Sequence, residues 1–362
     1  MDKKLFIVFN SLDIGGIETK IIDICQYYSQ QKNIKAFLLL KNRTGLLLGK
    51  LPKNVTLLSP QVTNLLKIKT AIFPFWLSLQ FKKYRPNLVI AFGNYCGISS
   101  VIGKTLSASA TKIIISDDSS IVEQIESDTF SNFRKYLVKI TYPAADKIIT
   151  LTSTGKNKLN KIIPNINNKI AILNNWLPLN FKPTNKLKKD IDILFLGRFE
   201  PQKNPLEFLA ISQKLINIFP HFKIVMIGYG SLLTQIKNYI TSNHLTKNIS
   251  ILPATVHPEK YLNRSKILLL TSFHEGFPLT ILEASASNCI PICRRLPELE
   301  SYFTYQRIYT LYNNINQAVD ILNDILSDTE LIKDICLHYC SKAFDFQGKN
   351  FQSTISLINE HL

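Results

Sequence analysis

Acidic residues are missing from one long stretch of this sequence. Between Ile24 and Ser116 there is no aspartate or glutamate, although the average composition would place about seven there. The same stretch contains thirteen lysines and arginines, and the 362-residue chain has a formal net charge of +17. A positive field of this kind suits nucleic acid, an anionic bilayer or an anionic acceptor molecule. We therefore expect the first half of the chain to meet a negatively charged partner.

Long hydrophobic runs are also missing. A membrane-spanning helix needs about 20 apolar residues in succession, whereas the longest candidate, Ala71–Leu77, is interrupted by Pro74. The start, Lys3-Lys4 followed by Leu5–Phe9, is similar to a signal peptide, but its apolar part has only about five residues. We interpret it as a first strand and expect a cytoplasmic protein.

Cysteines are few and do not suggest a zinc site. The six are Cys25, Cys96, Cys289, Cys293, Cys336 and Cys340. The last four form two pairs with three residues between the members, not the two residues that are usual in a zinc knuckle. We expect buried free thiols.

Short apolar strands alternate with helical patterns throughout the chain. In the first half, the predicted strands after Leu5–Phe9 are Ile34–Leu40, Leu88–Phe92, Ile113–Ser116, Lys147–Leu151 and Ile170–Leu173. This alternation predicts an α/β fold with doubly wound parallel sheets, whose ligand crevices lie beyond the carboxyl ends of the strands. The length and the 46% apolar content allow two domains with separate cores.

The interpretation of the remaining sequence depends on one stretch, Ile267–Glu283. Its first residues, Ile267–Leu270, have the apolar character of a strand buried on both faces. A turn follows, and Pro278 stands where the first residue of a helix is expected. Free amides at that helix start would favour a phosphate, as the helix dipole also does. The amides concerned are those of Phe277, Leu279 and Thr280.

Two carboxylates bracket this helix start, because Glu275 precedes it and Glu283 lies within it. Carboxylates accept hydrogen bonds from hydroxyls and repel phosphate, so the spacing suits a ligand with polyols on both sides of a phosphate bridge. A nucleotide sugar has that layout. The alternative is that both glutamates are solvated residues on a helix surface.

The segment Glu275-Gly276-Phe277-Pro278-x4-Glu283 resembles the E-x7-E signature of retaining, GT-B-fold glycosyltransferases of the family 4 type, also called glycosyl transferases group 1. The resemblance implies two Rossmann-like, doubly wound parallel-sheet domains that face each other across a cleft. It also implies that Glu275 binds the donor sugar and Glu283 the ribose. The distal phosphate would meet the segment Gly276, Phe277, Pro278, Leu279 and Thr280.

A second element follows the predicted strand Ile191–Leu196. Arg198 and Lys203 leave its carboxyl end five residues apart, which suits two cations closing on a pyrophosphate. Either one alone would be ordinary surface charge. Together they resemble the family's Gly-Arg-x4-Lys element, whose cations neutralise the departing diphosphate. The resemblance implies that they act in place of a metal ion, so we expect neither metal nor cofactor.

Three further glycines and a proline are candidates for donor binding. Gly228 follows the predicted strand Phe222–Ile227, where relatives have Gly-x-Gly, and Pro253 follows Ile249–Leu252, where the family's loop contacts the base. Gly15 and Gly16 open the helix after the first strand, where family members carry Gly-Gly that touches the donor across the cleft. A plain strand-to-helix turn is the alternative for this pair.

The loop after the predicted strand Ile113–Ser116 is a candidate position for a catalytic base of the first domain. Many relatives place a histidine in the loop that corresponds to Ser116–Ser119, but this chain has Asp117-Asp118 there and no histidine before His221. Asp118, or Asp117 in its place, could deprotonate an acceptor hydroxyl. The alternative is a helix N-cap.

The expected division is a first, acceptor-side domain at residues 1–176, a linker at 177–190 and a donor-binding domain at 191–345. The last segment, 346–362, is expected to pack back on the first domain. The linker assignment comes from its prolines and lysines, which follow no helical or strand period.

The resemblance implies retaining transfer of a hexose or N-acetylhexosamine from a nucleoside-diphosphate sugar, with UDP expected. The expected acceptor is a lipid-linked or phosphorylated saccharide in bacterial surface polysaccharide synthesis, such as lipopolysaccharide, O-antigen, capsule or exopolysaccharide. We expect no covalent glycosyl-enzyme, because Glu283 is assigned to the ribose. The alternatives are a nucleotide-sugar epimerase or hydrolase on the same fold and a catalytically degenerate partner subunit.

The stretch Asn64–Arg85 places aromatic and aliphatic residues between five cations. That mixture favours a membrane interface over a nucleic-acid groove, so we expect no nucleic acid as partner. The alternative is an ordinary helix that faces the core. Peripheral binding to the anionic inner face of the cell membrane, through the basic first domain, is therefore the expected localisation.

Overall fold

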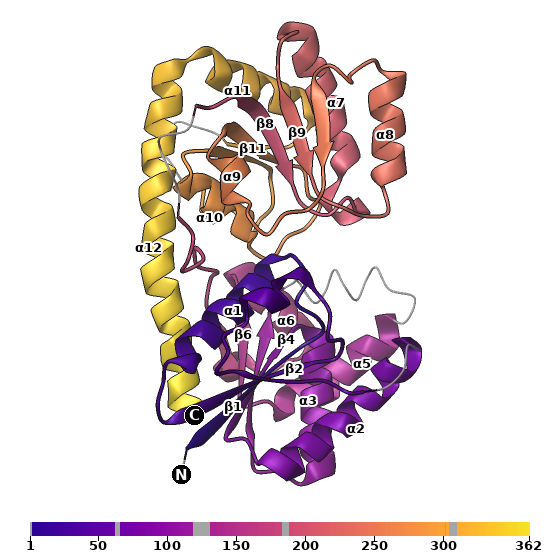
Figure 1. Ribbon diagram of the computed structural model, residues 1–362, viewed down its shortest axis with the longest axis vertical. Coiled ribbons are helices and arrows are strands. Elements are labelled where there is room, and N and C mark those ends of the chain that lie inside the picture. The colour runs from indigo at the N-terminus through magenta and orange to yellow at the C-terminus, as the bar shows by residue number, and fades with distance from the viewer. Residues whose placement is uncertain (1, 62–65, 119–130, 183–187, 301, 304–309) are drawn as a thin grey trace. The chain divides into compact units, whose positions relative to one another are not determined.

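The computed structural model describes residues 2–61, 66–118, 131–182, 188–300, 302–303 and 310–362. The chain forms two compact units (Figure 1). The first contains Met1–Asn175 and Asn350–Leu362, and the second contains Trp176–Lys349. Residues 183–187 of the predicted linker lie outside the described residues.

The first unit contains a seven-stranded parallel sheet in the order β3-β2-β1-β4-β5-β6-β7. Its strands are β1 Lys3–Phe9, β2 Ile34–Leu40, β3 Thr56–Leu58, β4 Leu88–Phe92, β5 Lys112–Asp117, β6 Lys147–Thr150 and β7 Ile170–Ile172. The six strands predicted for this half are confirmed. The short edge strand β3 was not predicted, because three residues give no readable pattern.

Helices cover both faces of this sheet. They are α1 Gly16–Ser29, α2 Leu66–Tyr84, α3 Asn94–Ser107, α5 Ser131–Thr141 and α6 Ser153–Ile162, with short 3₁₀ turns at Leu46–Lys50, Tyr142–Ala144 and Asn167–Lys169. The chain moves from β1 to β2 toward one edge but from β4 to β7 toward the other. Right-handed crossovers therefore put α1 on one face and α2, α3, α5 and α6 on the opposite face. One hydrophobic cluster joins the latter helices to the strands.

Helix α2 largely follows the core-facing alternative for the stretch Asn64–Arg85. Phe73, Leu77 and Phe81 are fully buried in the core cluster at four-residue spacing. Asn64 itself lies outside the described part of the chain. Helix α2 thus packs on the core through one side, and only its outer side is available to a partner.

The second unit contains a six-stranded parallel sheet in the order β10-β9-β8-β11-β12-β13. Its strands are β8 Ile191–Leu196, β9 Ile224–Ile227, β10 Ile249–Leu252, β11 Ser265–Leu270, β12 Ile290–Arg294 and β13 Leu311–Tyr312. Its helices are the 3₁₀ turn η4 Pro201–Lys203, then α7 Pro205–Ile218, α8 Leu233–Ser242, α9 Glu259–Leu262, α10 Leu279–Ala286 and α11 Ile315–Ser327. The fold class of two doubly wound α/β units is confirmed, and their facing across a cleft stays a prediction.

Each sheet has a point where its strand order reverses. In the first unit this point lies between β1 and β4, and in the second between β8 and β11. Loops that leave neighbouring strands in opposite directions open a crevice at such a point. Gly15-Gly16 follows β1, and the two strongest sequence elements follow β8 and β11.

The long last helix, α12 Thr329–His361, begins in the second unit and ends in the first. Its C-terminal part is fixed to the first unit by polar and aromatic contacts. Tyr28 donates a hydrogen bond of 2.9 Å to Asn359 Oδ1, and the rings of Tyr27 and Phe351 lie 5.8 Å apart in an edge-on arrangement. Residues after 349 are therefore structurally part of the first unit.

All six cysteines are free, and four of them are buried. Burial raises the pKa of the Cys25 and Cys289 thiols to about 12, so both stay protonated and unreactive at neutral pH. The prediction of free thiols is confirmed, although Cys336 and Cys340 are only half-buried. Among the helices described here, none combines the length and the hydropathy needed to cross a bilayer.

Candidate active site at the switch point of the second unit

The loop after β8 is held by its backbone and leaves Arg198 exposed. Phe199 is completely buried, and its N–H donates to Tyr229 O at 2.7 Å while its carbonyl accepts from Leu232 N at 2.9 Å. Arg198 next to it is exposed at the carboxyl end of the sheet. A buried anchor beside an exposed guanidinium suits a rigid anion site.

Gly228 has a structural reason to be glycine. A Cβ atom there would lie 1.9 Å from the carbonyl oxygen of Gly197, so no side chain fits between the loops after β8 and β9. Gly230 has φ +155°, and a Cβ there would also meet the backbone of Phe199. The close approach of the loops explains the Gly-x-Gly pattern. Donor contact by Gly228 stays a prediction.

The loop after β11 is locked to the loop after β8. The Thr271 hydroxyl donates to the carbonyls of Lys203 and Asn204, at 2.9 Å each. Gln202 adds two contacts between the same loops: its carbonyl accepts from Phe273 N at 2.9 Å, and its side-chain amide donates to His274 O at 3.1 Å. Two segments about 70 residues apart in sequence thus form one rigid rim.

This rim joins the predicted cations to the first glutamate. Lys203 Nζ lies 2.5 Å from Glu275 Oε1 in an ion pair, and the Glu275 side chain is 8% exposed against 22% for Lys203. Arg198 donates to Gln202 Oε1 at 3.3 Å. The structure therefore brings Arg198, Lys203 and Glu275 together, as the sequence elements required.

Gln202 is the residue in this rim that sequence reasoning missed. It is the bridge between Arg198 and the backbone of His274. The only signal in the sequence was its position inside the Gly-Arg-x4-Lys element, one residue before Lys203. A glutamine in a loop is ordinarily a solvated residue, so its bridging role needed coordinates.

The start of α10 differs by one residue from the prediction. Pro278 has φ −68° and ψ 124°, so it is the N-cap in extended conformation and the helix begins at Leu279. Proline fixes φ but not ψ, and its φ suits either position. The proline side chain at this N-cap makes no capping hydrogen bond. The amides of Leu279 and Thr280 belong to the first turn, which has no intrahelical acceptors.

Phe277 anchors the turn before this helix. Its ring is buried, stacks on Phe346 at 5.8 Å and meets Tyr302 edge-on at 5.6 Å. Gly276 beside it is half-buried and lies directly between Glu275 and the anchor. The aromatic contacts fix the direction in which the helix start points.

Both glutamates of the E-x7-E segment are buried, at 7% exposure each. The alternative that they are solvated surface residues is wrong. Glu283 lies in the second turn of α10, on the same helix whose first turn presents the amides. Burial of both carboxylates in one segment distinguishes them from ordinary surface glutamates.

Pro253, Gly15 and Gly16 occupy the expected loops. Pro253 is exposed directly after β10. Gly15 is the N-cap of α1 with extended backbone, and its carbonyl accepts from Thr19 N at 3.2 Å. Gly16 is the first residue of α1. Their contacts with a donor stay predictions.

Asp118 is not free to act as a base in this structure. It forms a buried ion pair with Lys20 of α1, and the two side chains are 1% and 4% exposed. Asp117, at the end of β5, is also buried. The residues after Asp118 lie outside the described part of the chain, so the N-cap alternative concerns residues that the structure does not describe. The pair favours a positioning role for Asp118 over proton abstraction.

Lys20 was not singled out from the sequence. It lies in α1, one turn after Gly16, and its ammonium also lies 5.9 Å from the centroid of the Phe92 ring. A lysine in an amphipathic helix is usually exposed. Only the tertiary structure shows that this one faces the end of β5.

An Asp-x-Asp triplet, Asp190-Ile191-Asp192, lies at the start of β8. Both carboxylates already have cationic partners: Arg264 binds Asp190 at 2.8 and 2.6 Å, and Lys266 lies 2.7 Å from Asp192. The hydrogen bonds from Arg264 lower the pKa of Asp190. Nowhere in the described ranges do three His, Cys, Asp or Glu side chains gather as a metal site.

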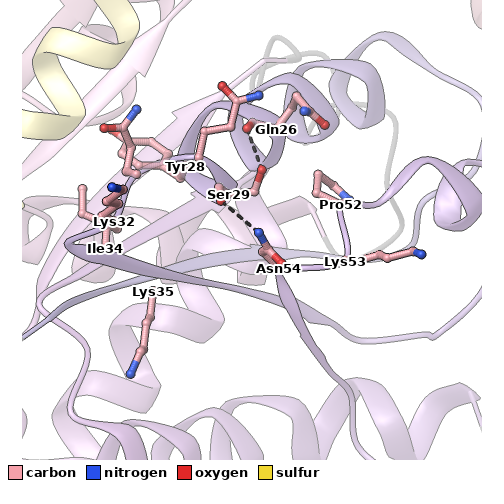
Figure 2. A pocket seen from close by; sticks show the side chains of 11 residues that line it. Gln26, Tyr28, Ser29, Lys32, Ile34, Lys35, Pro52, Lys53 and Asn54 are labelled. Atoms are coloured by element: carbon pink, nitrogen blue, oxygen red, sulfur yellow. Dashed lines mark hydrogen bonds between the residues drawn. The ribbon is translucent and has the colours of Figure 1, made fainter.

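A pocket in the first unit lies at the amino ends of strands of its sheet, away from the loops that follow the strands (Figure 2). It is lined by the end of α1 and by the residues before β2 and β3, including Gln26, Ser29 and Asn54. Asn54 Nδ2 donates to Ser29 O at 3.4 Å. These residues lie at the amino ends of the strands, so the pocket is separate from the switch-point loops.

A family model described as Glycosyl transferases group 1 matches residues 178–335, nearly all of the second unit. The chain is 25% identical to an uncharacterized glycosyltransferase of Methanocaldococcus jannaschii, over 57% of this chain and 55% of that protein. It thus spans about half the length of that relative. It is 23% identical to a Campylobacter jejuni alpha-1,4-N-acetyl-D-galactosaminyltransferase, over 80% of this chain and 78% of that protein.

The solved structure of HepE from Anabaena, in complex with UDP and glucose, is similar in fold. The TM-score is 0.79 at 15% identity, and the match covers 99% of this chain and 100% of that one. This likeness shows the fold, and the family model covers the unit that holds the rim and α10. The second unit therefore belongs to the glycosyl transferases group 1 family, and the chain as a whole has the GT-B fold.

Proposed function

We propose that the protein is a glycosyltransferase that binds a nucleoside-diphosphate sugar, with UDP as the nucleotide, at the switch point of its second unit. The observation that carries the proposal is the Lys203–Glu275 pair, 2.5 Å apart, with Glu275 in the turn before the start of α10, whose N-cap is a proline. A cation, a carboxylate and helix amides in one place match the diphosphate and the hydroxyls of such a donor.

Donor binding would exchange the partners of this pair. When Lys203 turns to a phosphate, the buried Glu275 carboxylate loses its cation and needs another hydrogen-bond donor. A hydroxyl of the donor sugar is that donor in our proposal. A nucleotide without a sugar would leave Glu275 unpartnered, so the site would discriminate in favour of the complete donor.

Charge builds on the leaving phosphate as the glycosidic bond breaks. Arg198, Lys203 and the first-turn amides of α10 would stabilise that charge, and their rigid backbone fixes them before the reaction. We propose that these groups act without a metal ion. We also propose retention of the anomeric configuration without a covalent glycosyl-enzyme, because Glu283 is assigned to the ribose.

The proposed acceptor is a lipid-linked saccharide in bacterial surface polysaccharide synthesis, and the proposed donor sugar is a hexose or N-acetylhexosamine. The name of the C. jejuni relative describes transfer of N-acetylgalactosamine to a saccharide on undecaprenyl diphosphate, which supports this class. The basic first unit suits an acceptor that carries a diphosphate. The protein would then act peripherally at the inner face of the cell membrane.

The test is turnover of a panel of UDP-hexoses and UDP-N-acetylhexosamines, with and without a polyprenyl-diphosphate saccharide. We expect UDP release that requires the acceptor, persists in EDTA and gives a product of retained configuration by NMR. UDP release without acceptor would instead identify a hydrolase, and an isomerised donor would identify an epimerase. Absence of turnover with donor binding intact would favour a degenerate partner subunit.

A further inference from the structure

Three neighbouring helices of the first unit carry no carboxylate. Helices α2, α3 and α5 lie side by side on one face of the sheet (Figure 1). Their 44 residues contain no aspartate or glutamate. They contain eight cations: Lys67, Lys69, Lys82, Lys83, Lys104, Arg134, Lys135 and Lys139. We call the outer surface of these helices the basic face.

Helix α5 exposes an apolar stripe on this face. Phe133, Tyr136 and Ile140 are 62%, 59% and 52% exposed. Their spacing of three and four residues puts them on one side of the helix. Val138, on another side, is completely buried in the core cluster. The helix therefore reaches the core through one side and presents large hydrophobic groups to the solvent on another.

Helices α2 and α3 also carry exposed hydrophobic side chains. Phe75 and Leu79, one turn apart on α2, and Leu106 near the end of α3 are also exposed. Over the described residues of the first unit, eight large hydrophobic side chains are exposed, and six belong to these three helices. Such a concentration on three neighbouring helices favours an interaction site.

A helix of the second unit shows what an ordinary outer surface looks like. Helix α11 buries Ala318, Val319 and Leu322 and presents Asp320 and Asp324 to the solvent. Its outward side is polar and acidic, whereas that of α5 is apolar with flanking cations. The basic face thus differs from the outer side of α11 in both charge and hydrophobicity.

We propose that the basic face binds an anionic lipid bilayer, with Phe133, Tyr136 and Ile140 entering the interface and the flanking cations meeting lipid phosphates. The choice of a bilayer rests on charge complementarity together with the apolar stripe, since a nucleic acid would match only the cations. Such binding would bring the first unit to a bilayer that holds the proposed lipid-linked acceptor. The biological purpose of the binding rests on the proposed function, whereas the binding itself does not.

The test is co-sedimentation of the full chain with vesicles of phosphatidylcholine alone and of phosphatidylcholine mixed with phosphatidylglycerol. We expect binding only to the mixed vesicles and release as the ionic strength rises. The triple variant Phe133→Ser, Tyr136→Ser, Ile140→Ser should lower the vesicle partition coefficient at least about tenfold. A second variant, Lys135→Glu with Lys139→Glu, should weaken binding to the mixed vesicles by a similar factor.

The matched control is Leu46→Ser with Ile172→Ser, which removes exposed apolar side chains of the same unit from outside the basic face. It should bind as the unaltered chain does. Circular dichroism and thermal unfolding establish that each variant is folded. Equal binding by control and triple variant would overturn the proposal. Self-association of the chain through the basic face, detected by light scattering, would also overturn it.

Failure of this proposal is distinguishable from failure of the proposed function. Vesicle binding is measured without donor or turnover, and turnover of a detergent-solubilised acceptor requires no bilayer. We expect the triple variant to retain that soluble turnover, because none of its residues lies at the switch point of either sheet. Loss of turnover in detergent would contradict a role limited to the membrane.

Discussion

Both units place a lysine beside a carboxylate at the carboxyl edge of a sheet, but solvent reaches the two pairs differently. In the second unit the Lys203 side chain is 22% exposed, whereas in the first unit Lys20 and Asp118 are enclosed. A ligand can reach Lys203 and take it from Glu275. Lys20 and Asp118 are 4% and 1% exposed, so a ligand would reach them only after a change in structure. Residue types alone do not separate an exchangeable pair from a structural one.

The largest effect that would test this comparison is expected from Lys20→Met. It leaves the Asp118 carboxylate buried without its cation, which should lower the free energy of unfolding by about 3–5 kcal/mol. Urea unfolding followed by circular dichroism measures the loss. The double variant Lys20→Met, Asp118→Leu should recover most of it, and Lys35→Met, at an exposed ion pair with Asp2, should change little.

The interpretation of Lys20–Asp118 as a structural pair would be wrong if Asp118→Asn kept its stability and nucleotide binding but lost transfer. Asp118 would then act on the acceptor, as one of the sequence interpretations held. A loss of stability with transfer unchanged per folded molecule would confirm the positioning role.

The next largest effect, a loss of transfer activity, is expected from Glu275→Ala. Removing the partner of the sugar hydroxyl should lower kcat for transfer by about 10²–10³-fold while UDP affinity stays nearly the same. Calorimetry should also show that the unaltered protein prefers the UDP-sugar to UDP and that the variant does not. Glu330→Ala, at an exposed pair with Lys333, is the control. Equal losses of transfer and UDP affinity would make Glu275 a structural residue.

A smaller effect is expected from Arg198→Ala. The guanidinium is exposed and held by a 3.3 Å bond to Gln202, so its contact with a phosphate is partly screened by solvent. UDP affinity should fall about tenfold, near the lower end of what a charge-assisted hydrogen bond contributes. Arg198→Lys should recover part of it. An unchanged UDP affinity would remove Arg198 from the site.

The smallest effect concerns the pair at the amino end of β8. Arg264 lowers the pKa of Asp190, but both side chains are more than a third exposed. Asp190→Asn should therefore cost less than about 1 kcal/mol at pH 7. Because the folded-state pKa is lowered, this contribution is present above the ordinary aspartate pKa of about 3.9 and is lost as pH falls through the lower folded value. Urea unfolding at pH 7 and pH 3 tests both the size and the sign.

Strands buried on both faces were the easiest elements to predict. Ile34–Leu40, Leu88–Phe92 and Ile191–Leu196 coincide with β2, β4 and β8, because parallel strands between two helix layers must be apolar throughout. The edge strands β3 and β13 are only three and two residues long and were not predicted. Their formation depends on a neighbouring strand and not on a pattern of their own.

The donor-side residues were predictable because their spacing along the chain is short. Arg198 and Lys203 lie in one loop, and Glu275 and Glu283 lie in one turn and its helix. Gln202 and Lys20 were not predictable, since their roles come from partners 72 and 98 residues away. Side chains of the same type are usually solvated, so nothing local marks these two.

Local sequence patterns were enough to predict the two parallel sheets, the helix start after Gly276 and the residues that surround it. The apolar strand runs and the local E-x7-E spacing specify them without long-range information. Which of the two lysines is exposed to a ligand, and which side of each helix faces outward, could be seen only in the folded chain. Those outcomes depend on burial and on contacts between distant segments, which no local pattern encodes.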